Sequence, residues 1–286
     1  MDDGTLKKED YIEPRCPLCE EPYGAEPAVK PVPQQRIIEK MNEYMSRRDY
    51  AGAERHLLYW LEEAKLGQDL RGQLMLRNEL VGHYRKTGER DKAFGNAEAA
   101  LRLIEAMDFD GTISSGTTYV NCATAFNAFG ENERAAALFA KARKVYEAAP
   151  QTRPELLGGL YNNMALTCAA LRRFDEARGL YALAMEQMGR VPGGCLEQAI
   201  TCLNIANLIE DERGLEAGEG EIFDLLDRAY ELLDPKDERP GDAPRDGYYA
   251  FVCEKCAPTF SYYGYFAAAE ELERRSEELY AKYGRE

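Results

Sequence analysis

Residues 121–142 read NCATAFNAFGENERAAALFAKA, and they carry the clearest signal of the chain's architecture. On both sides of Gly130, small and large apolar residues recur at three- and four-residue spacing, which is the pattern of two amphipathic helices joined by a tight turn. An alanine at a helix crossing lets the two helices approach closely, because it leaves room for a large side chain from the partner helix. The stretch therefore predicts a helical hairpin.

The same hairpin recurs along the chain. Ala53, Ala93, Ala135 and Ala177 are separated by 40, 42 and 42 residues, and Ala123, Ala165 and Ala206 by 42 and 41. A fixed period of this length is typical of helical solenoids. We expect six hairpins, over residues 34–67, 69–108, 115–149, 154–190, 195–234 and 247–285. The step from Ala206 to Ala257 is 51, and we place the extra residues in a loop within the acidic, glycine-rich stretch 211–221.

The first 33 residues differ from the rest. They hold six of the 13 prolines and show no helical periodicity, so we interpret residues 1–33 as an extended or irregular arm and residues 34–286 as the repeat domain. Later prolines fall mostly at segment edges. Pro258 is the exception, and we expect it to bend or interrupt its helix.

The composition excludes several classes of function. With 36 Lys and Arg against 51 Asp and Glu, the formal net charge is −15, which repels nucleic-acid phosphates and anionic lipid. No segment approaches the length of an apolar membrane span. The N-terminal residues carry no apolar run typical of a secretory signal, and eight cysteines without such a signal favour reduced thiols. We therefore expect a cytoplasmic protein that binds neither nucleic acid nor membrane.

The repeat resembles the tetratricopeptide repeat over nearly all of residues 34–286. Repeat three supplies Ala123, Phe126, Gly130, Ala135, Phe139 and Ala142, and repeat four supplies Ala165, Phe174, Ala177, Tyr181 and Ala184. Arg48 and Arg172 replace the usual turn glycine, Cys168 replaces an aromatic residue, and the 42-residue step is similar to the long repeats of kinesin light chains. The resemblance implies an all-α, right-handed α–α superhelix, or solenoid, of about six hairpins.

Three asparagines occupy one place in successive repeats. Asn121, Asn163 and Asn204 each lie two residues before the small anchor, so they should stack along the inner groove of a solenoid. In the resembled family an Asn at this place commonly holds the backbone of a bound extended peptide, and an amide offers both an acceptor and donors. The alternative is that each Asn bonds only a neighbouring helix or solvent.

The same register predicts further groove residues, namely Asn78, Arg85, Lys86, Asn127, Asn162 and Asn207. Repeat two is locally basic, which resembles the carboxylate clamp that some family members use on peptide C-termini. An ordinary solvated helix end would carry the same charges. Tyrosine and phenylalanine gather between residues 248 and 266, where we expect mostly core and, at the rim, a contact surface.

Two Cys-x-x-Cys pairs are candidate metal ligands. Four thiolates bind zinc tetrahedrally. Cys16 and Cys19 lie in the arm, which contains no His and no further Cys, so a site there needs Cys253 and Cys256 or the arm of another chain. Cys253 and Cys256 stand where the repeat normally buries apolar groups, and we expect them in the core. We expect no cofactor, with zinc at Cys16 and Cys19 as the one candidate.

Material for catalysis is scarce. The two histidines, His56 and His83, lie in different repeats, and no phosphate-binding glycine loop, His-Glu-x-x-His or nucleophile elbow is present. We expect a non-enzymatic scaffold that captures a protein or peptide ligand in its groove; in one variant the arm occupies the groove until a partner competes. The alternatives are a zinc-organised assembly or regulatory protein and, more remotely, an enzyme or redox protein. The oligomeric state is left open.

Overall fold

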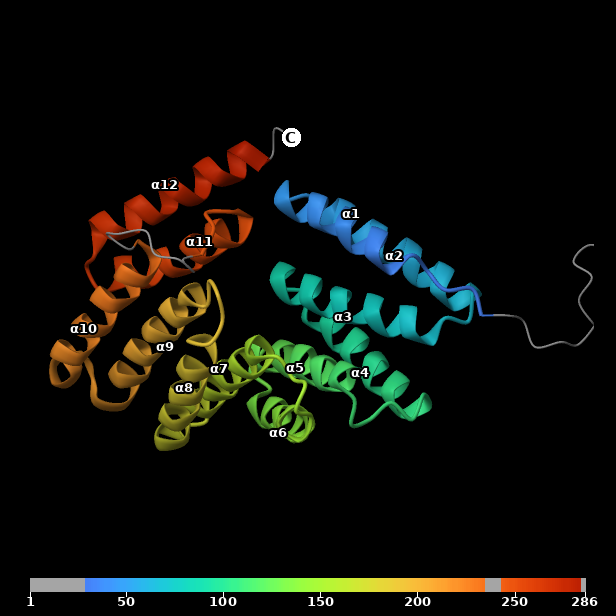
Figure 1. Ribbon diagram of the computed structural model, residues 1–286, viewed down its shortest axis with the longest axis horizontal. Helices are drawn as coiled ribbons and strands as arrows, with labels where there is room; N and C mark the ends of the chain where they lie inside the picture. Colours follow the sequence, from blue (N-terminus) through green and yellow to red (C-terminus); the bar gives the residue numbers. More distant parts are fainter. Residues whose placement is uncertain (1–28, 235–242, 284–286) are drawn as a thin grey trace, which may run out of the picture.

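The structure is a computed structural model that describes residues 29–234 and 243–283, and within these ranges the chain forms twelve α-helices and no strand (Figure 1). The helices pair into hairpins: α1 (Gln34–Ser46) with α2 (Tyr50–Leu66), α3 (Leu70–Thr87) with α4 (Arg90–Ala106), α5 (Ile113–Ala128) with α6 (Asn132–Ala148), α7 (Pro154–Ala170) with α8 (Phe174–Met188), α9 (Cys195–Arg213) with α10 (Leu215–Leu233), and α11 (Gly247–Tyr262) with α12 (Phe266–Tyr283). The prediction of an all-α, tetratricopeptide-like solenoid with six hairpins is confirmed.

The hairpins stack side by side along a curve. The odd-numbered helices lie toward the inside of the curve and the even-numbered ones outside, as the view in Figure 1 shows for α3 to α12. Successive inner helices touch one another from α3 to α11, so the inner face is one continuous surface. None of the described helices has the length and apolar character needed to cross a bilayer.

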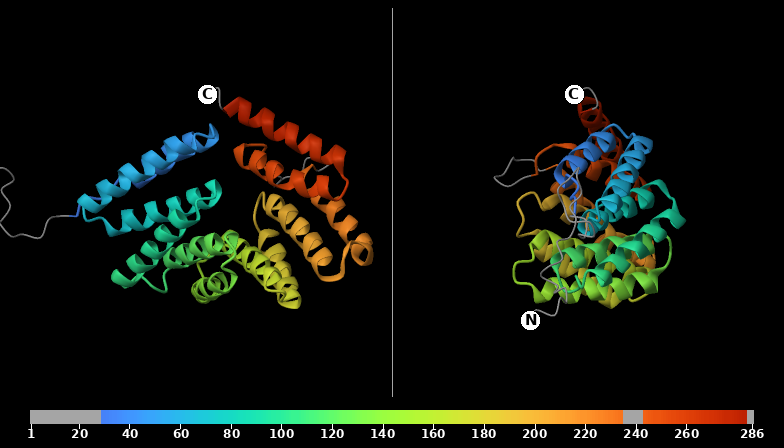
Figure 2. Two further views of the ribbon diagram at one scale, coloured as in Figure 1. Left: turned by 180° about the vertical axis from the view of Figure 1, so that it is seen from behind. Right: turned by 90° about the vertical axis from the view of Figure 1, so that its right-hand side faces the viewer.

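The curve brings the two ends of the repeat domain together (Figure 2). An Arg48 Nη2 group after α1 donates to Glu254 Oε1 of α11 at 2.9 Å, and the Arg48 guanidinium lies 4.9 Å from the ring centroid of Tyr280 on α12. The Lys86 ammonium at the end of α3 lies 5.8 Å from the Phe251 ring of α11. The solenoid is therefore a nearly closed ring.

The small residues of the repeat lie at helix crossings, as predicted. The anchor alanines are fully buried, among them Ala53, Ala93, Ala135 and Ala177. Gly116 of α5 shows the close approach most clearly, because a Cβ there would stand 2.5 Å from Cε1 of the buried Tyr146. The hairpins thus interlock small residues on one helix with aromatic side chains on the other.

The turns between paired helices use the left-handed conformation. Gly88, Gly130 and Gly264 have φ of 79°, 83° and 84°, and Arg48 and Arg172 take the same place with φ of 54° and 63°. This conformation costs a residue with a side chain about 1 kcal/mol. Both arginines form contacts that offset this cost, Arg48 with Glu254 and Arg172 with the Asp211 carbonyl at 3.3 Å.

The predicted loop at residues 211–221 is wrong. These residues end α9 and begin α10, with only Gly214 between the two helices. Gly218 is a packing residue, since a Cβ there would stand 2.4 Å from Cγ2 of Ile209. Most of the extra length lies in the connection 234–246, which is longer than the corresponding connection 189–194; residues 235–242 are outside the described ranges.

The predicted interruption at Pro258 is also wrong, because α11 runs through it. Proline removes the hydrogen bond to the carbonyl four residues earlier, which belongs to Glu254. Both Pro258 and Glu254 are exposed, so water can satisfy that carbonyl. Solvent access at this position explains why the helix continues.

Candidate functional site

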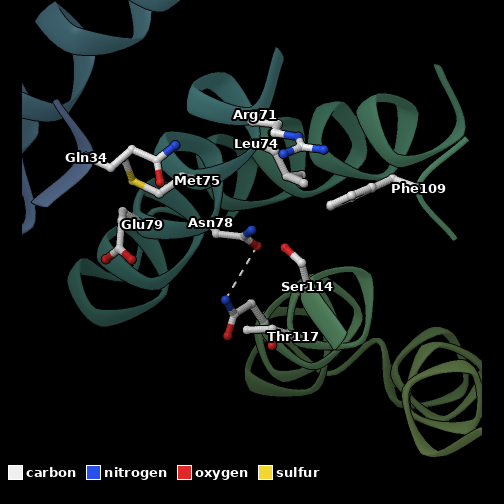
Figure 3. Close-up of a pocket in the computed structure, with 10 residues that line it drawn as sticks. Gln34, Arg71, Leu74, Met75, Asn78, Glu79, Phe109, Ser114 and Thr117 are labelled. Carbon is white, nitrogen blue, oxygen red and sulfur yellow. Dashed lines mark hydrogen bonds between the residues drawn. The ribbon is translucent and has the colours of Figure 1, made fainter. Parts of the chain in front are cut away.

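The inner face is hollowed between α3 and α5 (Figure 3). The cavity has a volume of about 490 Å³. Leu74, Met75 and Phe109 supply its apolar lining, and Asn78, Glu79 and Asn121 are among its polar groups. Two of the predicted groove residues, Asn78 and Asn121, therefore line one cavity together with side chains that can take an apolar group.

Hydrogen bonds join the two asparagines of this cavity to each other. The Asn121 amide donates to Asn78 Oδ1 at 3.4 Å, drawn as the dashed line in Figure 3, and the Asn78 amide donates to Thr118 Oγ1 at 2.9 Å. The α3 and α5 helices are thus linked across the repeat boundary by polar side chains. The amides here bond a neighbouring helix, which is the alternative that the sequence left open.

The same arrangement recurs between α7 and α9. Asn162 Oδ1 accepts from the Asn204 amide at 3.1 Å and from the Thr201 hydroxyl at 3.2 Å. Asn162 stands 84 residues after Asn78, two repeats of 42, and Val120 occupies the intervening place. Because valine offers no hydrogen bond, this link is missing between α5 and α7 within the described structure.

Asn163 bonds within its own helix. Its amide donates to the Gly159 carbonyl at 2.9 Å. The Oδ1 atoms of Asn121, Asn163 and Asn204 accept no hydrogen bond from any described residue, and all three side chains are half-buried. Each of the three therefore retains a carbonyl oxygen for an N–H donor from outside the chain.

Two predicted groove residues serve other contacts. The Asn127 amide donates to Asn132 Oδ1 at 3.1 Å across the turn between α5 and α6. Asn207 Oδ1 accepts from the Tyr263 hydroxyl at 3.1 Å. Neither lines the cavity, so the structure does not bring these two together with Asn78 and Asn121.

The last turn of α3 is cationic. Arg85 and Lys86 are exposed, and neither forms an ion pair with a carboxylate among the described residues. Lys86 Nζ lies 5.3 Å from the Tyr50 ring in addition to its contact with Phe251. Desolvation by the surrounding protein lowers the pKa of the Arg85 guanidinium, which remains charged at neutral pH. These cations are available to an anionic group.

Glu79 is the acidic member of the cavity. Burial raises the pKa of its carboxyl above the ordinary value for glutamate. Sequence reasoning missed Glu79 and Met75 of the same cavity. Their spacing of four residues places them on one face of α3 with Asn78, so the groove register could have found them.

The metal candidates divide into two groups. Cys16 and Cys19 lie outside the described residues. Cys253 and Cys256 are buried, as expected from the repeat, and burial raises the pKa of both thiols, that of Cys256 to about 12. A protonated thiol is a poor metal ligand, so this pair gives no support to a shared four-cysteine zinc site. Within the described ranges no cluster of three or more His, Cys, Asp or Glu could hold a metal ion.

Comparison with known proteins finds solved structures with a similar fold. No family model and no curated protein matches the chain. The structure is similar to that of BtubC (BKLC) from P. vanneervenii, with 18% sequence identity, a TM-score of 0.46, and coverage of 88% of this chain and 92% of that one. It is also similar to the nearly identical TPR-like repeats of a Podosopora anserina kinesin light chain, with 15% identity, a TM-score of 0.49, and coverage of 75% and 98%.

Proposed function

We propose that this tetratricopeptide-like solenoid is a non-catalytic scaffold that binds a partner protein by capturing an extended segment of it along the inner face. The observation that carries the proposal is the cavity between α3 and α5, where Asn78 and Asn121 stand beside Leu74 and Met75. A peptide needs both features, because its backbone must be hydrogen-bonded and one of its side chains must be buried.

Each residue of the inner face has a distinct role in this proposal. The free Oδ1 atoms of Asn121, Asn163 and Asn204 accept backbone N–H groups of the segment. Asn78 orients Asn121, because its Oδ1 accepts a hydrogen bond from the Asn121 amide. Asn162 orients Asn204 in the same way. A half-buried asparagine held by a neighbour loses less conformational freedom on binding than an unrestrained one.

The cations define the charge of the segment. Arg85 and Lys86 stand on the same helix as Asn78, about two turns beyond it, and have no carboxylate partner in the described structure. An acidic side chain or a terminal carboxylate of the segment would form charge-assisted hydrogen bonds with them. We therefore expect the bound segment to carry at least one acidic group.

The test begins with peptides selected from a random displayed library on the intact chain. The dissociation constant of a selected, fluorescein-labelled peptide is then measured by fluorescence anisotropy. In the triple variant Asn121→Ala, Asn163→Ala, Asn204→Ala, affinity should fall roughly a hundredfold, because each lost hydrogen bond contributes about 1 kcal/mol. Asn96→Ala on the outer helix α4 is the matched control and should bind as the parent does.

Two results would contradict the proposal. One is a triple variant that is folded by circular dichroism and binds the selected peptides as tightly as the parent. The other is a selection that yields peptides without acidic groups whose affinity is unchanged by Arg85→Glu and Lys86→Glu.

A further inference from the structure

The first hairpin and the residues that flank it expose several large apolar side chains. Five large hydrophobic side chains are exposed within residues 29–70: Val29 (60%), Leu58 (40%), Tyr59 (58%), Leu66 (80%) and Leu70 (41%). The outer helices α4, α6 and α8, which the structure describes in full, expose no large hydrophobic side chain, whereas α10 exposes Leu215 (44%) and α12 exposes Phe266 (64%), each a single residue at the start of its helix. A cluster of this kind at one end of a solenoid points to a covering segment, because terminal repeats otherwise present polar faces.

Three of these side chains share one side of a helix. At 3.6 residues per turn, positions 58, 59 and 66 fall on the same side of α2. Arg55 belongs to that side too, is exposed, and has no ion-pair or hydrogen-bond partner among the described residues. We call the side formed by Arg55, Leu58, Tyr59 and Leu66 the α2 face. Glu62 also falls on this side, where it pairs with Lys65 at 2.6 Å, so the face is largely apolar and carries one unpaired positive charge, that of Arg55.

The chain enters the repeat domain beside this face. The Lys30 N–H donates to the Gly67 carbonyl at 2.9 Å, directly after Leu66, and the Val32 N–H donates to Asp69 Oδ2 at 3.0 Å. The approach is close, because a Cβ on Gly67 would stand 2.5 Å from the Lys30 carbonyl oxygen. Residues 30–32 thus already run along the turn between α2 and α3, and residue 28 lies one position before the exposed Val29.

We propose that residues 1–28 fold back onto the α2 face and cover it. Leu18 and Tyr23 supply apolar side chains, and residues 1–28 contain eight Asp and Glu against three Lys and Arg, which complements Arg55. The reach is sufficient, because the stretch from Tyr23 to Val29 extends to about 20 Å while Leu66 and Leu58 are about 12 Å apart along the helix. The tether raises the effective concentration of the arm at this face.

The chain contains its own reporter for this contact. Trp60 is the sole tryptophan, it lies on α2, and its ring centroid is 5.3 Å from that of Tyr59. An acceptor of tryptophan emission is attached to Cys16 in the full chain carrying Cys19→Ser and Cys195→Ser. Cys195 is replaced because it is half-buried, whereas the other described cysteines are buried and protected from labelling.

The measurement is the quenching of Trp60 emission at several protein concentrations. We expect strong quenching that does not depend on concentration. In Leu66→Ser the ratio of covered to uncovered chains should fall about tenfold, because one buried leucine changes an equilibrium constant by about that factor. Leu215→Ser on α10 replaces another exposed leucine, 44% accessible, and should be quenched as the parent is.

Other outcomes overturn the proposal. Absence of quenching, or equal quenching in the parent and in Leu66→Ser, would show that the arm does not lie on the α2 face. Quenching that rises with concentration and is relieved by unlabelled chains would identify a second copy as the occupant. Thermal melts followed by circular dichroism check that Leu66→Ser is folded, which the 80% exposure of Leu66 favours.

Discussion

The side chains of Arg48 and Glu254 form an ion pair at 2.9 Å although 206 residues separate them. The Tyr280 hydroxyl donates to the same carboxylate at 3.2 Å, and the Tyr280 ring lies against the Arg48 guanidinium. This one cluster joins the first hairpin to the last. Since the groups are about half-exposed, the cluster closes the ring with a small free energy.

Arg48→Glu should open the ring with little loss of stability. An exposed ion pair contributes about 1 kcal/mol or less, so the melting temperature should change by only a few degrees, while repulsion from Glu254 separates the terminal hairpins. Small-angle X-ray scattering should show a larger radius of gyration. The double variant Arg48→Glu, Glu254→Arg should restore the parental value, and failure to do so would show that the pair does not hold the ring closed.

Glu79→Gln should stabilise the protein at neutral pH by about 0.5 kcal/mol. The raised pKa means that the folded state disfavours the ionised carboxylate. The parent therefore loses stability as pH rises above 4.5, the ordinary pKa of glutamate, and this loss is absent at lower pH, where the carboxyl is protonated in both states. The difference between variant and parent in urea unfolding should therefore be present at pH 7 and vanish below about pH 4. Glu98→Gln, which removes a carboxylate bonded to Arg134 at 3.3 Å, should not stabilise at either pH.

The boundary of the arm can be tested by two truncations. Removing residues 1–33 leaves the buried Asp69 without the Val32 N–H that its Oδ2 accepts, and it removes the buried Val32 side chain. Removing residues 1–28 keeps both. The shorter chain should be less stable than the longer one by about 1 to 3 kcal/mol, the range for an unsatisfied buried acceptor. Equal midpoints in urea unfolding would contradict this assignment.

Gly116→Ala should destabilise by about 1 to 3 kcal/mol, because the new methyl group would overlap the Tyr146 ring. Alanine is otherwise the better helix former. Gly95→Ala in α4 is the matched control, since a Cβ there meets nothing within 4 Å, and it should stabilise by about 0.5 to 1 kcal/mol. Thermal unfolding of the two variants distinguishes close packing from helix propensity, and a stabilised Gly116→Ala would refute the packing role.

Part of the inner face followed from the repeat register, and part did not. The register placed Asn78, Asn121, Asn162 and Asn204 on inner helices, where the structure has them. It did not reveal that Asn78 bonds Asn121 and Asn162 bonds Asn204, because those contacts depend on how far one hairpin is displaced against the next. The same register assigned Asn127 and Asn207 to the groove, whereas their contacts are with a turn and with Tyr263.

The hairpins follow from the sequence alone, since the spacing of small and apolar residues, together with turn positions such as Gly130 and Arg172, specifies each helix pair from local contacts. The closure of the ring, in contrast, is a property of the tertiary structure. Closure depends on the sum of small rotations between successive repeats, and no single repeat encodes that sum. The contact between Arg48 and Glu254 results from this closure, and so does the contact between Lys86 and Phe251.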